Sequence, residues 1–226
     1  FPTRRSSDLD KVTTVSPTYS QEILTPQYGE HLEMVLNIRK YDLWGITNGI
    51  DIEYWDPKND PEIPYHYNKV NVKKAKGLNK EALQKELGLN VDQNVLLIGV
   101  VSRLTWQKGF YLMMEKLSEI CAMPIQLAVL GSGEASIEEK MAQLEAGNKG
   151  KIAFYKGYND SLAHRIYGAC DLFLMPSLFE PCGISQLISM RYGTLPLVRE
   201  TGGLKDTVTP YNEFEKRSEE HTSELQ

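Results

Sequence analysis

Cysteine is scarce in this chain, and its three residues form no recognisable motif. Cys121, Cys170 and Cys182 are odd in number, and no pair has the short spacing of a zinc or redox site. Two of them lie in apolar segments, where a buried thiol is the usual state. This usage indicates a reducing compartment, hence a cytoplasmic protein, and gives no sign of a metal site.

Long apolar runs and concentrated basic charge are also missing. No run approaches the roughly 20 apolar residues that a membrane helix needs. Lys and Arg number 25 against 30 Asp and Glu, for a formal net charge of −5, which argues against a nucleic-acid footprint. Residues 69–76 are the one basic run, and we interpret them as a solvated loop or helix edge.

The two ends of the chain differ in character from its interior. Residues 1–9, FPTRRSSDL, and 217–226, RSEEHTSELQ, look like in-frame translations of common sequencing-adapter oligonucleotides. The codons AGA TCG GAA GAG CAC ACG TCT GAA CTC CAG encode the second segment letter for letter. Ordinary charged tails are the alternative. We interpret both segments as artefacts and expect a gene fragment over 10–216, with parts missing on both sides.

From about residue 91 onward, short apolar runs alternate with helical patterns. Residues 95–101, VLLIGVV, leave no room for a polar face, as expected for a strand covered on both sides. Strands alternating with helices predict a parallel sheet with right-handed crossovers, which is a Rossmann-like α/β domain. Further strands are expected at 125–130, 152–155, 172–175 and 195–198, and helices at 109–121, 134–146, 161–167 and 183–192.

The first part of the chain follows a different pattern. A strand end at 12–16 runs into Ser16-Pro17, a good helix start, and 45–51 predicts a short strand. Residues 54–68 are rich in Pro, Asp, Asn and Tyr, which suits a domain boundary. A helix at 79–87 then leads into the sheet. We assign 10–50 to the remnant of a preceding domain, 51–90 to a connection and 91–216 to the Rossmann-like domain.

The strongest functional pattern lies in residues 176–203, PSLFEPCGISQLISMRYGTLPLVRETGG. An apolar strand runs into Glu180, and a helix start and the Gly202-Gly203 turn follow. This order places a lone carboxylate and free backbone N–H groups at the carboxyl edge of a sheet, where open α/β folds bind ligands. Glu180 suits sugar hydroxyls or the charge developing at an anomeric carbon, although capping a helix is its alternative role. A second carboxylate is missing, which argues against a glycosidase.

Two cations follow the first strand of the sheet. Arg103 offers a planar fork and Lys108 a compact charge, so together they could stabilise a departing diphosphate without a metal. Solvated loop cations are the alternative. The glycines of 131–133, GSG, and of 201–203, TGG, could approach a phosphate, but for each motif alone tight-turn packing is the favoured interpretation. Ser136 stands where a dinucleotide fingerprint needs a third glycine, which disfavours a dehydrogenase.

Other polar residues receive structural roles. Asp51 and Glu53 mimic an acidic metal pair, but their place in the boundary segment indicates turn chemistry. His66 and His164 lack partners at metal-ligand spacing, which favours surface or capping roles.

Several motifs in one order resemble bacterial glycogen synthase, which is closely related to plant starch synthase. They are VTTVSPTY at 12–19, GITNGID at 45–51, SRLTWQKG at 102–109, GY at 157–158, HRI at 164–166, FEPCG at 179–183 and TGGLKDTV at 201–208. The resemblance covers nearly all of 10–208. It implies the two-domain GT-B fold, with 91–216 as a truncated nucleotide-sugar-binding domain, and transfer of glucose from ADP-glucose to the non-reducing end of an α-1,4-glucan with retention.

The resemblance also implies roles for individual residues. Arg103 and Lys108 would contact the diphosphate and, with Glu180, would be the catalytic residues. The substrate-binding set would be Tyr158 at the adenine, Cys182 and Gly183 at the glucose, the amides of Ile184 and Ser185 at the distal phosphate, and Gly202 and Gly203 at phosphate. No metal or cofactor is expected, ADP-glucose being a substrate. Nucleic acid and membrane are not expected partners, and no oligomeric state is predicted.

Departures from the family limit these expectations. A second glutamate, eight positions after the first in the wider class of retaining transferases, is replaced here by Ile188. The family's amino-terminal Lys-Thr-Gly-Gly-Leu segment, most of its acceptor domain and the helix after residue 208 are absent, so we expect the isolated chain to be inactive. The alternatives are a non-catalytic nucleotide-sugar-binding half-domain and a related transferase using UDP-glucose. A phosphorylase would need a pyridoxal-phosphate lysine motif, which we do not find.

Overall fold

The computed structural model describes residues 10–212 and 217–218, and its contacts divide them into two compact units. The sheet unit comprises Ile50–Leu178 and Ile184–Arg199, and the terminal unit comprises the remaining described residues. Each unit is made of separate segments of the chain, whereas each predicted domain is one continuous segment. The domain borders expected near residues 50, 90 and 216 remain predictions. The adapter-like ends lie almost wholly outside the described residues.

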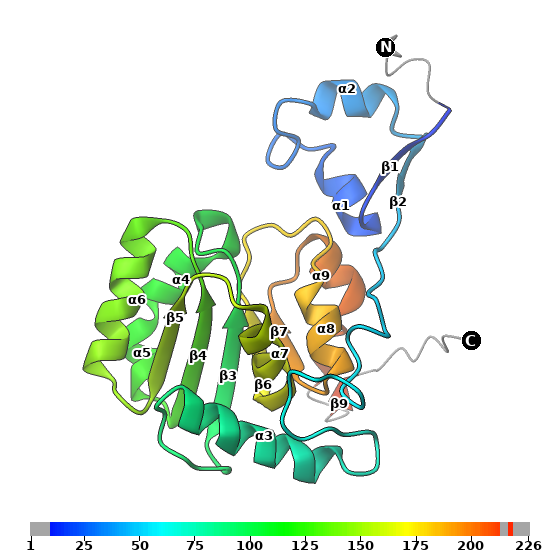
Figure 1. Cartoon of the computed structure of the whole chain (residues 1–226). Coiled ribbons are helices and arrows are strands. Elements are labelled where there is room, and N and C mark those ends of the chain that lie inside the picture. Colours follow the sequence, from blue (N-terminus) through cyan, green and yellow to red (C-terminus); the bar gives the residue numbers. More distant parts are fainter. Residues whose placement is uncertain (1–9, 213–216, 219–226) are drawn as a thin grey trace. The chain divides into compact units, whose positions relative to one another are not determined.

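A five-stranded, all-parallel sheet forms the centre of the sheet unit (Figure 1). The chain runs outward from β3 through β4 to β5, and then returns to place β6 on the other side of β3. The expected Rossmann-like sheet is therefore confirmed, and its order reverses between β3 and β6. The order is β5-β4-β3-β6-β7, with bounds β3 Leu96–Val101, β4 Ile125–Gly131, β5 Ile152–Lys156, β6 Leu172–Met175 and β7 Leu195–Val198.

One face of the sheet is covered by α4 (Phe110–Glu115) and α6 (Ala135–Gly147). Phe110 and Ile137 are almost fully buried and belong to one apolar cluster with strand residues such as Val129. Burying side chains of this size stabilises the fold by about 1.5–3 kcal/mol each. The single helix expected at 109–121 is instead two, because Lys116 (φ −102°, ψ 8°) separates α4 from α5 (Leu117–Ala122) and its N–H bonds to Met113 O at 3.1 Å.

The other face is covered by α7 (Asp160–Ala169). Gly99 of β3 allows a close approach here, since a Cβ on it would lie 2.6 Å from Ile166 Cγ2 and 2.8 Å from Cys170 Sγ. α3 (Val72–Glu86) packs on α7 in turn, and it begins seven residues before the predicted start at 79. α8 (Ser185–Arg191) leads from β6 to β7. Helices on both faces explain why the strands are so uniformly apolar.

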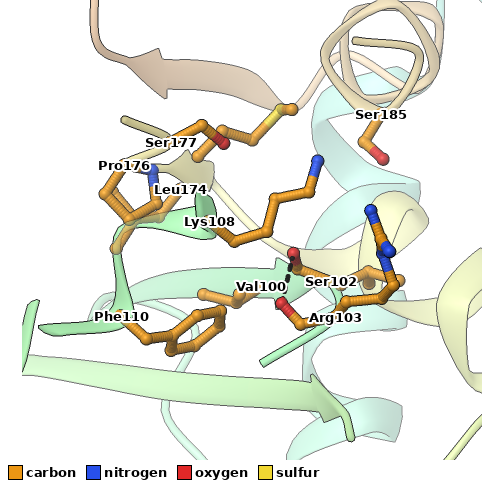
Figure 2. A pocket seen from close by; sticks show the side chains of 11 residues that line it. Val100, Ser102, Arg103, Lys108, Phe110, Leu174, Pro176, Ser177 and Ser185 are labelled. Carbon is orange, nitrogen blue, oxygen red and sulfur yellow. Dashed lines mark hydrogen bonds between the residues drawn. The ribbon is translucent and has the colours of Figure 1, made fainter. Parts of the chain in front are cut away.

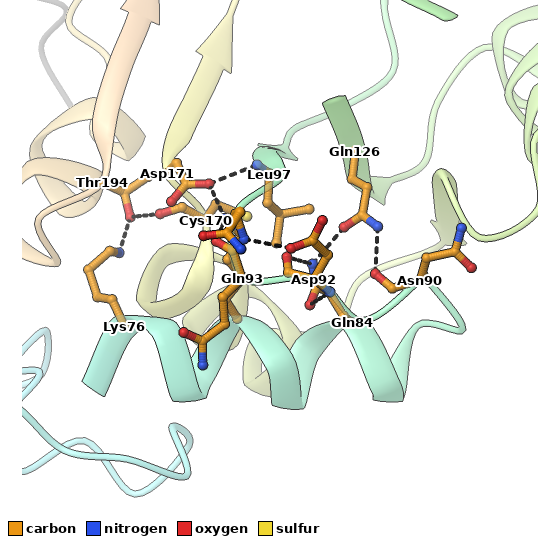
Figure 3. Close-up of polar contacts among 12 residues, drawn as sticks. Lys76, Gln84, Asn90, Asp92, Gln93, Leu97, Gln126, Cys170, Asp171 and Thr194 are labelled. Atoms are coloured by element: carbon orange, nitrogen blue, oxygen red, sulfur yellow. Dashed lines mark hydrogen bonds and ion pairs between the residues drawn. The ribbon is translucent and has the colours of Figure 1, made fainter. Parts of the chain in front are cut away.

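A half-buried lysine joins α3 to two other helix ends (Figure 3). Lys76 Nζ donates to Thr194 Oγ1 at 2.6 Å, and to the carbonyls of Tyr192 (3.2 Å), Gly168 (3.3 Å) and Tyr167 (3.4 Å). Burial lowers the pKa of Lys76 to about 8. The solvated role expected for residues 69–76 is therefore wrong for Lys76, because it reaches backbone carbonyls at the C-terminal ends of α7 and α8, which attract a cation.

The expected surface role is also wrong for His164, which is fully buried. Its Nδ1 lies 2.8 Å from Asp60 Oδ2, and its ring stacks on Trp55 with centroids 4.1 Å apart. Tyr192 OH donates to the same Asp60 oxygen. His66 is exposed, as expected. Sequence spacing could not reveal the partners of His164, because Asp60 is 104 positions away.

The terminal unit contains short elements. The parallel pair β1 (Val12–Thr14) and β2 (Leu43–Gly45) flanks α1 (Pro17–Glu22), which starts as predicted, with Ser16 Oγ accepting from Tyr19 N at 2.9 Å. The strand expected at 45–51 is wrong, because β2 ends at Gly45 and 46–51 has no regular structure. The remaining elements are α2 (Glu33–Ile38), α9 (Gly202–Thr207) and the antiparallel pair β8 (Tyr211–Asn212) and β9 (Arg217–Ser218).

None of the helices within 10–212 combines the length and apolarity needed to cross a membrane.

Candidate functional site

A cavity of about 210 Å³ opens in the sheet unit where β3 and β6 end (Figure 2). This is the point at which the strand order reverses, and open α/β sheets bind ligands at such points, outside the carboxyl ends of the strands. The residues that line it come from β3 and its loop, from the start of α4, from β6 and its loop, and from the start of α8. They are Val100, Val101, Ser102, Arg103, Lys108, Phe110, Leu174, Met175, Pro176, Ser177 and Ser185.

Two cations converge on this cavity. The side chains of Arg103 and Lys108 extend into the same opening, beside the hydroxyl of Ser185 (Figure 2). Carboxylates are absent from the residues described as lining it. The structure therefore brings together three of the predicted site residues, Arg103, Lys108 and Ser185. Their surroundings suit an anionic group, to which Arg103 offers a planar fork and Lys108 a point charge.

A close backbone approach holds the Lys108 loop against the end of β6. Lys108 is the last residue of η2 (Trp106–Lys108), a single 3₁₀ turn, and Gly109 follows it with φ +75°. A Cβ on Gly109 would lie 1.9 Å from Pro176 O, so no other residue fits. Leu178 N also donates to Gln107 O at 2.8 Å. The two loops that carry the cavity are thereby fixed to each other.

The glycines of 131–133 pack against the loop that follows β3. Leu104 N donates to Ser132 O at 2.9 Å, and Glu134 N donates to Leu104 O at 2.8 Å. A Cβ on Gly131 would lie 2.0 Å from Ser102 O, and one on Gly133 would lie 2.2 Å from Leu104 O. The interpretation of GSG as tight packing is confirmed.

Tyr158 lies just beyond β5, two strands from β3, and is 86% exposed. Its OH donates to Asp160 Oδ1 at 3.0 Å, a bond that raises the pKa of Tyr158. Asp160 Oδ2 accepts from Tyr54 OH at 2.7 Å. Tyr158 does not line the cavity. It follows β5, which lies two strand spacings, or about 10 Å, from β3, where the cavity opens.

The remaining predicted residues, apart from Ile184, lie in the terminal unit. Glu180 and Cys182 are buried, and Gly203 N donates to Glu180 O at 3.0 Å. A Cβ on Gly203 would lie 2.2 Å from Cys182 O, so this glycine permits close backbone packing. Gly183 has φ +72°. Ile184 is in the sheet unit, where it precedes α8 and is 46% exposed.

A carboxylate that the sequence did not reveal holds the glycine turn. Glu22 Oε1 accepts from Gly202 N at 2.9 Å and from Thr201 Oγ1 at 3.3 Å. Both glycine amides of the turn therefore donate inside the terminal unit, so the phosphate role of Gly202 and Gly203 stays a prediction. No signal marked Glu22, because it is an ordinary acidic residue at the end of a helix.

The acidic pair of the boundary segment forms a turn, as predicted. Asp51 Oδ1 accepts from Glu53 N and from Tyr54 N, both at 3.0 Å. Groups of three or more His, Cys, Asp or Glu side chains that could hold a metal do not occur among residues 10–212 and 217–218.

Comparisons with known proteins agree with this geometry. Residues 79–221 match the family model of glycosyl transferases group 1, and residues 9–38 match that of the starch synthase catalytic domain. A glycogen synthase from Lachnospira eligens is 52% identical over 206 residues, covering 91% of this chain and 43% of its own length. One from Geobacillus thermodenitrificans is 50% identical over 207 residues, covering 92% and 42%.

Solved structures agree on the fold. The catalytic domain of starch synthase IV from Arabidopsis thaliana, bound to ADP and acarbose, has a TM-score of 0.84 at 38% identity, covering 90% of this chain and 42% of that one. Anabaena Alr3699/HepE in complex with UDP-glucose, at 20% identity and a TM-score of 0.59, is similar in fold alone. The α/β fold with its parallel sheet thus matches the GT-B glycosyltransferases.

The chain spans about two fifths of the length of the curated relatives that it matches. Because the family model covers residues 79–221, well over half of the sequence, this chain belongs to the group 1 glycosyl transferases.

Proposed function

We propose that this chain carries the donor-diphosphate site of a glycogen synthase. In the whole protein, glucose would pass from ADP-glucose to the non-reducing end of an α-1,4-glucan with retention. The observation that carries the proposal is the convergence of Arg103 and Lys108 on the cavity between β3 and β6. Similarity to glycogen synthases at about half of all positions supports the same assignment.

The chemistry requires stabilisation of a leaving diphosphate. Breaking the bond between the anomeric carbon and the phosphate oxygen leaves negative charge on ADP. The acceptor oxygen forms the new bond to the anomeric carbon, and its proton would pass to the departing phosphate oxygen. Fixed cations aimed at that charge stabilise the transition state without reorganising. Arg103 would bind two phosphate oxygens through its fork, and Lys108 would act as a point charge. No metal or cofactor is part of this proposal.

The dimensions of the site suit part of a nucleotide sugar. The cavity of about 210 Å³ is smaller than the roughly 300–1,000 Å³ of pockets that enclose drug-sized ligands, so it would hold the phosphates alone. Tyr158 would stack on adenine about two strand spacings away, or about 10 Å. The ADP bound in the Arabidopsis starch synthase supports an adenine nucleotide.

The glucose would be held by Glu180, Cys182 and Gly183, with phosphate contacts from the amides of Ile184 and Ser185 and from Gly202 and Gly203. Glu180 stands five residues before Ser185 in the chain. Its buried carboxylate would bind sugar hydroxyls or face the positive charge that develops at the anomeric carbon. The three free cysteines support a cytoplasmic setting.

Binding and turnover test the proposal separately. We expect ADP to bind this chain measurably by isothermal titration, more tightly than UDP, and Lys108→Ala to weaken ADP binding at least about tenfold. We expect no incorporation of radiolabelled glucose from ADP-glucose into glycogen by this chain alone. Tighter binding of UDP would favour the alternative donor, and wild-type ADP affinity in Lys108→Ala would overturn the site. Incorporation by the chain alone would refute its expected inactivity.

A further inference from the structure

Glu134 links the loop that carries Lys108 to the neighbouring strand loop. It stands between β4 and α6, just before Ala135. Its Oε1 accepts from Trp106 N at 2.7 Å, and its Oε2 accepts from Tyr111 OH at 2.8 Å. Both carboxylate oxygens therefore accept hydrogen bonds from the segment 106–111, one from a residue before Lys108 and one from a residue after it.

The bond to Trp106 N acts at the start of the turn that carries Lys108. The turn η2 has three residues, and Lys108 N donates to Thr105 O at 3.1 Å. In a 3₁₀ turn the first N–H groups have no partner within the turn, so an outside acceptor is needed. Gly109 fixes the other end of the turn against Pro176. The turn that carries Lys108 is consequently fixed at its start by the Glu134 side chain and at its end by the close backbone approach of Gly109.

We propose that Glu134 is a positioning residue for Lys108, holding its ammonium group where a diphosphate binds. This inference rests on the proposed function of the cavity. Glu134 itself does not line the cavity, so it would act through the backbone of 106–108 and not by touching the ligand. The Tyr111 hydroxyl, which also lies 3.4 Å from Ser136 Oγ, completes the clamp from α4.

Glu134 could affect anion binding in two opposite ways, through its negative charge and through its hydrogen bonds to the turn. A negative charge close to a diphosphate weakens binding by repulsion, whereas hydrogen bonds to the turn strengthen it by preorganisation. Glutamine keeps an oxygen that can accept from Trp106 N and an amide that can donate to the Tyr111 hydroxyl. Glu134→Gln should therefore retain the clamp, and Glu134→Ala should lose it.

The test is a double-mutant cycle read out by ADP affinity. Isothermal titration of ADP would be carried out on the full chain, on Glu134→Ala, Glu134→Gln, Tyr111→Phe and Lys108→Ala, and on two double variants that combine Lys108→Ala with Glu134→Ala or with Tyr111→Phe. Glu139→Ala, at an exposed position of α6, five residues after Glu134, is the matched control. Thermal unfolding followed by circular dichroism reports whether each variant is folded.

We expect Glu134→Ala to weaken ADP binding about threefold to tenfold, because losing the hydrogen bonds to the turn outweighs removing a negative charge near the anion. Tyr111→Phe should weaken it less, and Glu139→Ala should bind like wild type. Glu134→Gln, which keeps the hydrogen bonds and removes the negative charge, should bind ADP at least as tightly as wild type. In the Lys108→Ala background, Glu134→Ala should have no further effect, because it acts through Lys108. A purely structural role would instead weaken binding equally in both backgrounds.

The outcomes separate this inference from the proposed function. If ADP binds and Lys108→Ala weakens it, but folded Glu134→Ala binds like wild type or its effect adds fully to that of Lys108→Ala, the positioning role is wrong and the site stands. If Glu134→Ala does not fold, a Tyr111→Phe variant whose effect adds to that of Lys108→Ala overturns it in the same way. If the chain does not bind ADP, both proposals fall.

Discussion

Lys76 Nζ lies 2.6 Å from Thr194 Oγ1, whose hydrogen in turn faces Tyr167 O at 2.6 Å and Cys170 O at 2.9 Å. The four acceptors of Lys76 are all uncharged. Carbonyls at the ends of α7 and α8 and a threonine hydroxyl thus surround a cation whose stem is only partly covered but whose ammonium group is enclosed. Because burial lowers the pKa of this ammonium group, the free energy of unfolding should depend on pH through Lys76.

We predict that wild type gains stability relative to Lys76→Met as pH rises from about 8 to 10.5. The pKa of Lys76 is lowered by burial to about 8 from an ordinary 10.5, so in this window the unfolded chain binds more protons than the folded one. Raising the pH therefore favours the folded state. Urea unfolding at several pH values measures the difference. Lys73→Met, exposed on the same helix, should parallel wild type, and parallel curves for Lys76→Met would contradict the prediction.

Tyr192→Phe should destabilise the sheet unit by about 1–3 kcal/mol. The substitution removes the hydroxyl that donates to the buried Asp60 carboxylate, which then keeps only His164 and the backbone N–H of Glu62. Urea unfolding followed by circular dichroism gives the change in free energy. Tyr211→Phe, at a tyrosine that is 63% exposed, serves as the control and should change stability by less than about 0.5 kcal/mol.

Gly109→Ala should lower stability by more than about 2 kcal/mol and weaken ADP binding. The new Cβ would meet Pro176 O at 1.9 Å on a backbone with φ +75°, so the Lys108 turn must move. Gly147→Ala is the matched control, because it lies in α6 with no atom within 4 Å of the new Cβ. It should be neutral or stabilising by up to about 1 kcal/mol. Equal stability of the two variants would mean that the close approach is not essential.

Glu180→Ala and Lys108→Ala should each reduce turnover at least about tenfold, which is about 1.4 kcal/mol of barrier. The measurement needs a longer protein that joins this chain to the upstream region present in its relatives, with glucose incorporation from ADP-glucose as the readout. Glu139→Ala should leave turnover unchanged. Wild-type rates in both site variants would refute their assignment.

Much of the sheet unit could be predicted from sequence because continuous apolar runs and glycines report local requirements. Residues 172–175 and 195–198 form strands with the expected bounds, and Ser16 caps its helix as its type suggests. The prediction of a strand at 45–51 is wrong, because β2 ends at Gly45. Gly45 packs closely against the backbone, and a Cβ on it would lie 2.1 Å from Ser16 O.

Polar residues with distant partners could not be predicted in this way. Lys76, His164, Glu22 and Glu134 look like ordinary surface residues in the sequence, and their roles come from acceptors or donors on other elements. Arg103 and Lys108 were identifiable only because the first strand of a Rossmann-like sheet ends at the ligand-binding edge. Their meeting with Ser185 depends on the order of the strands, which the apolar pattern does not specify.

The Tyr67 hydroxyl donates to Tyr192 O across 125 positions of sequence, alongside the Lys76 and Asp60 contacts of similar reach. On a ribosome that adds about 5–20 residues per second, the earlier partner emerges on the order of 10 s before the later one exists. Throughout that interval the Lys76 ammonium group on α3 and the Tyr67 phenol, which precedes α3, lack acceptors that have not yet been synthesised. Completion of the sheet unit is therefore a late event in synthesis, and the nascent chain must keep its apolar β3 and β4 from other chains until β7 arrives.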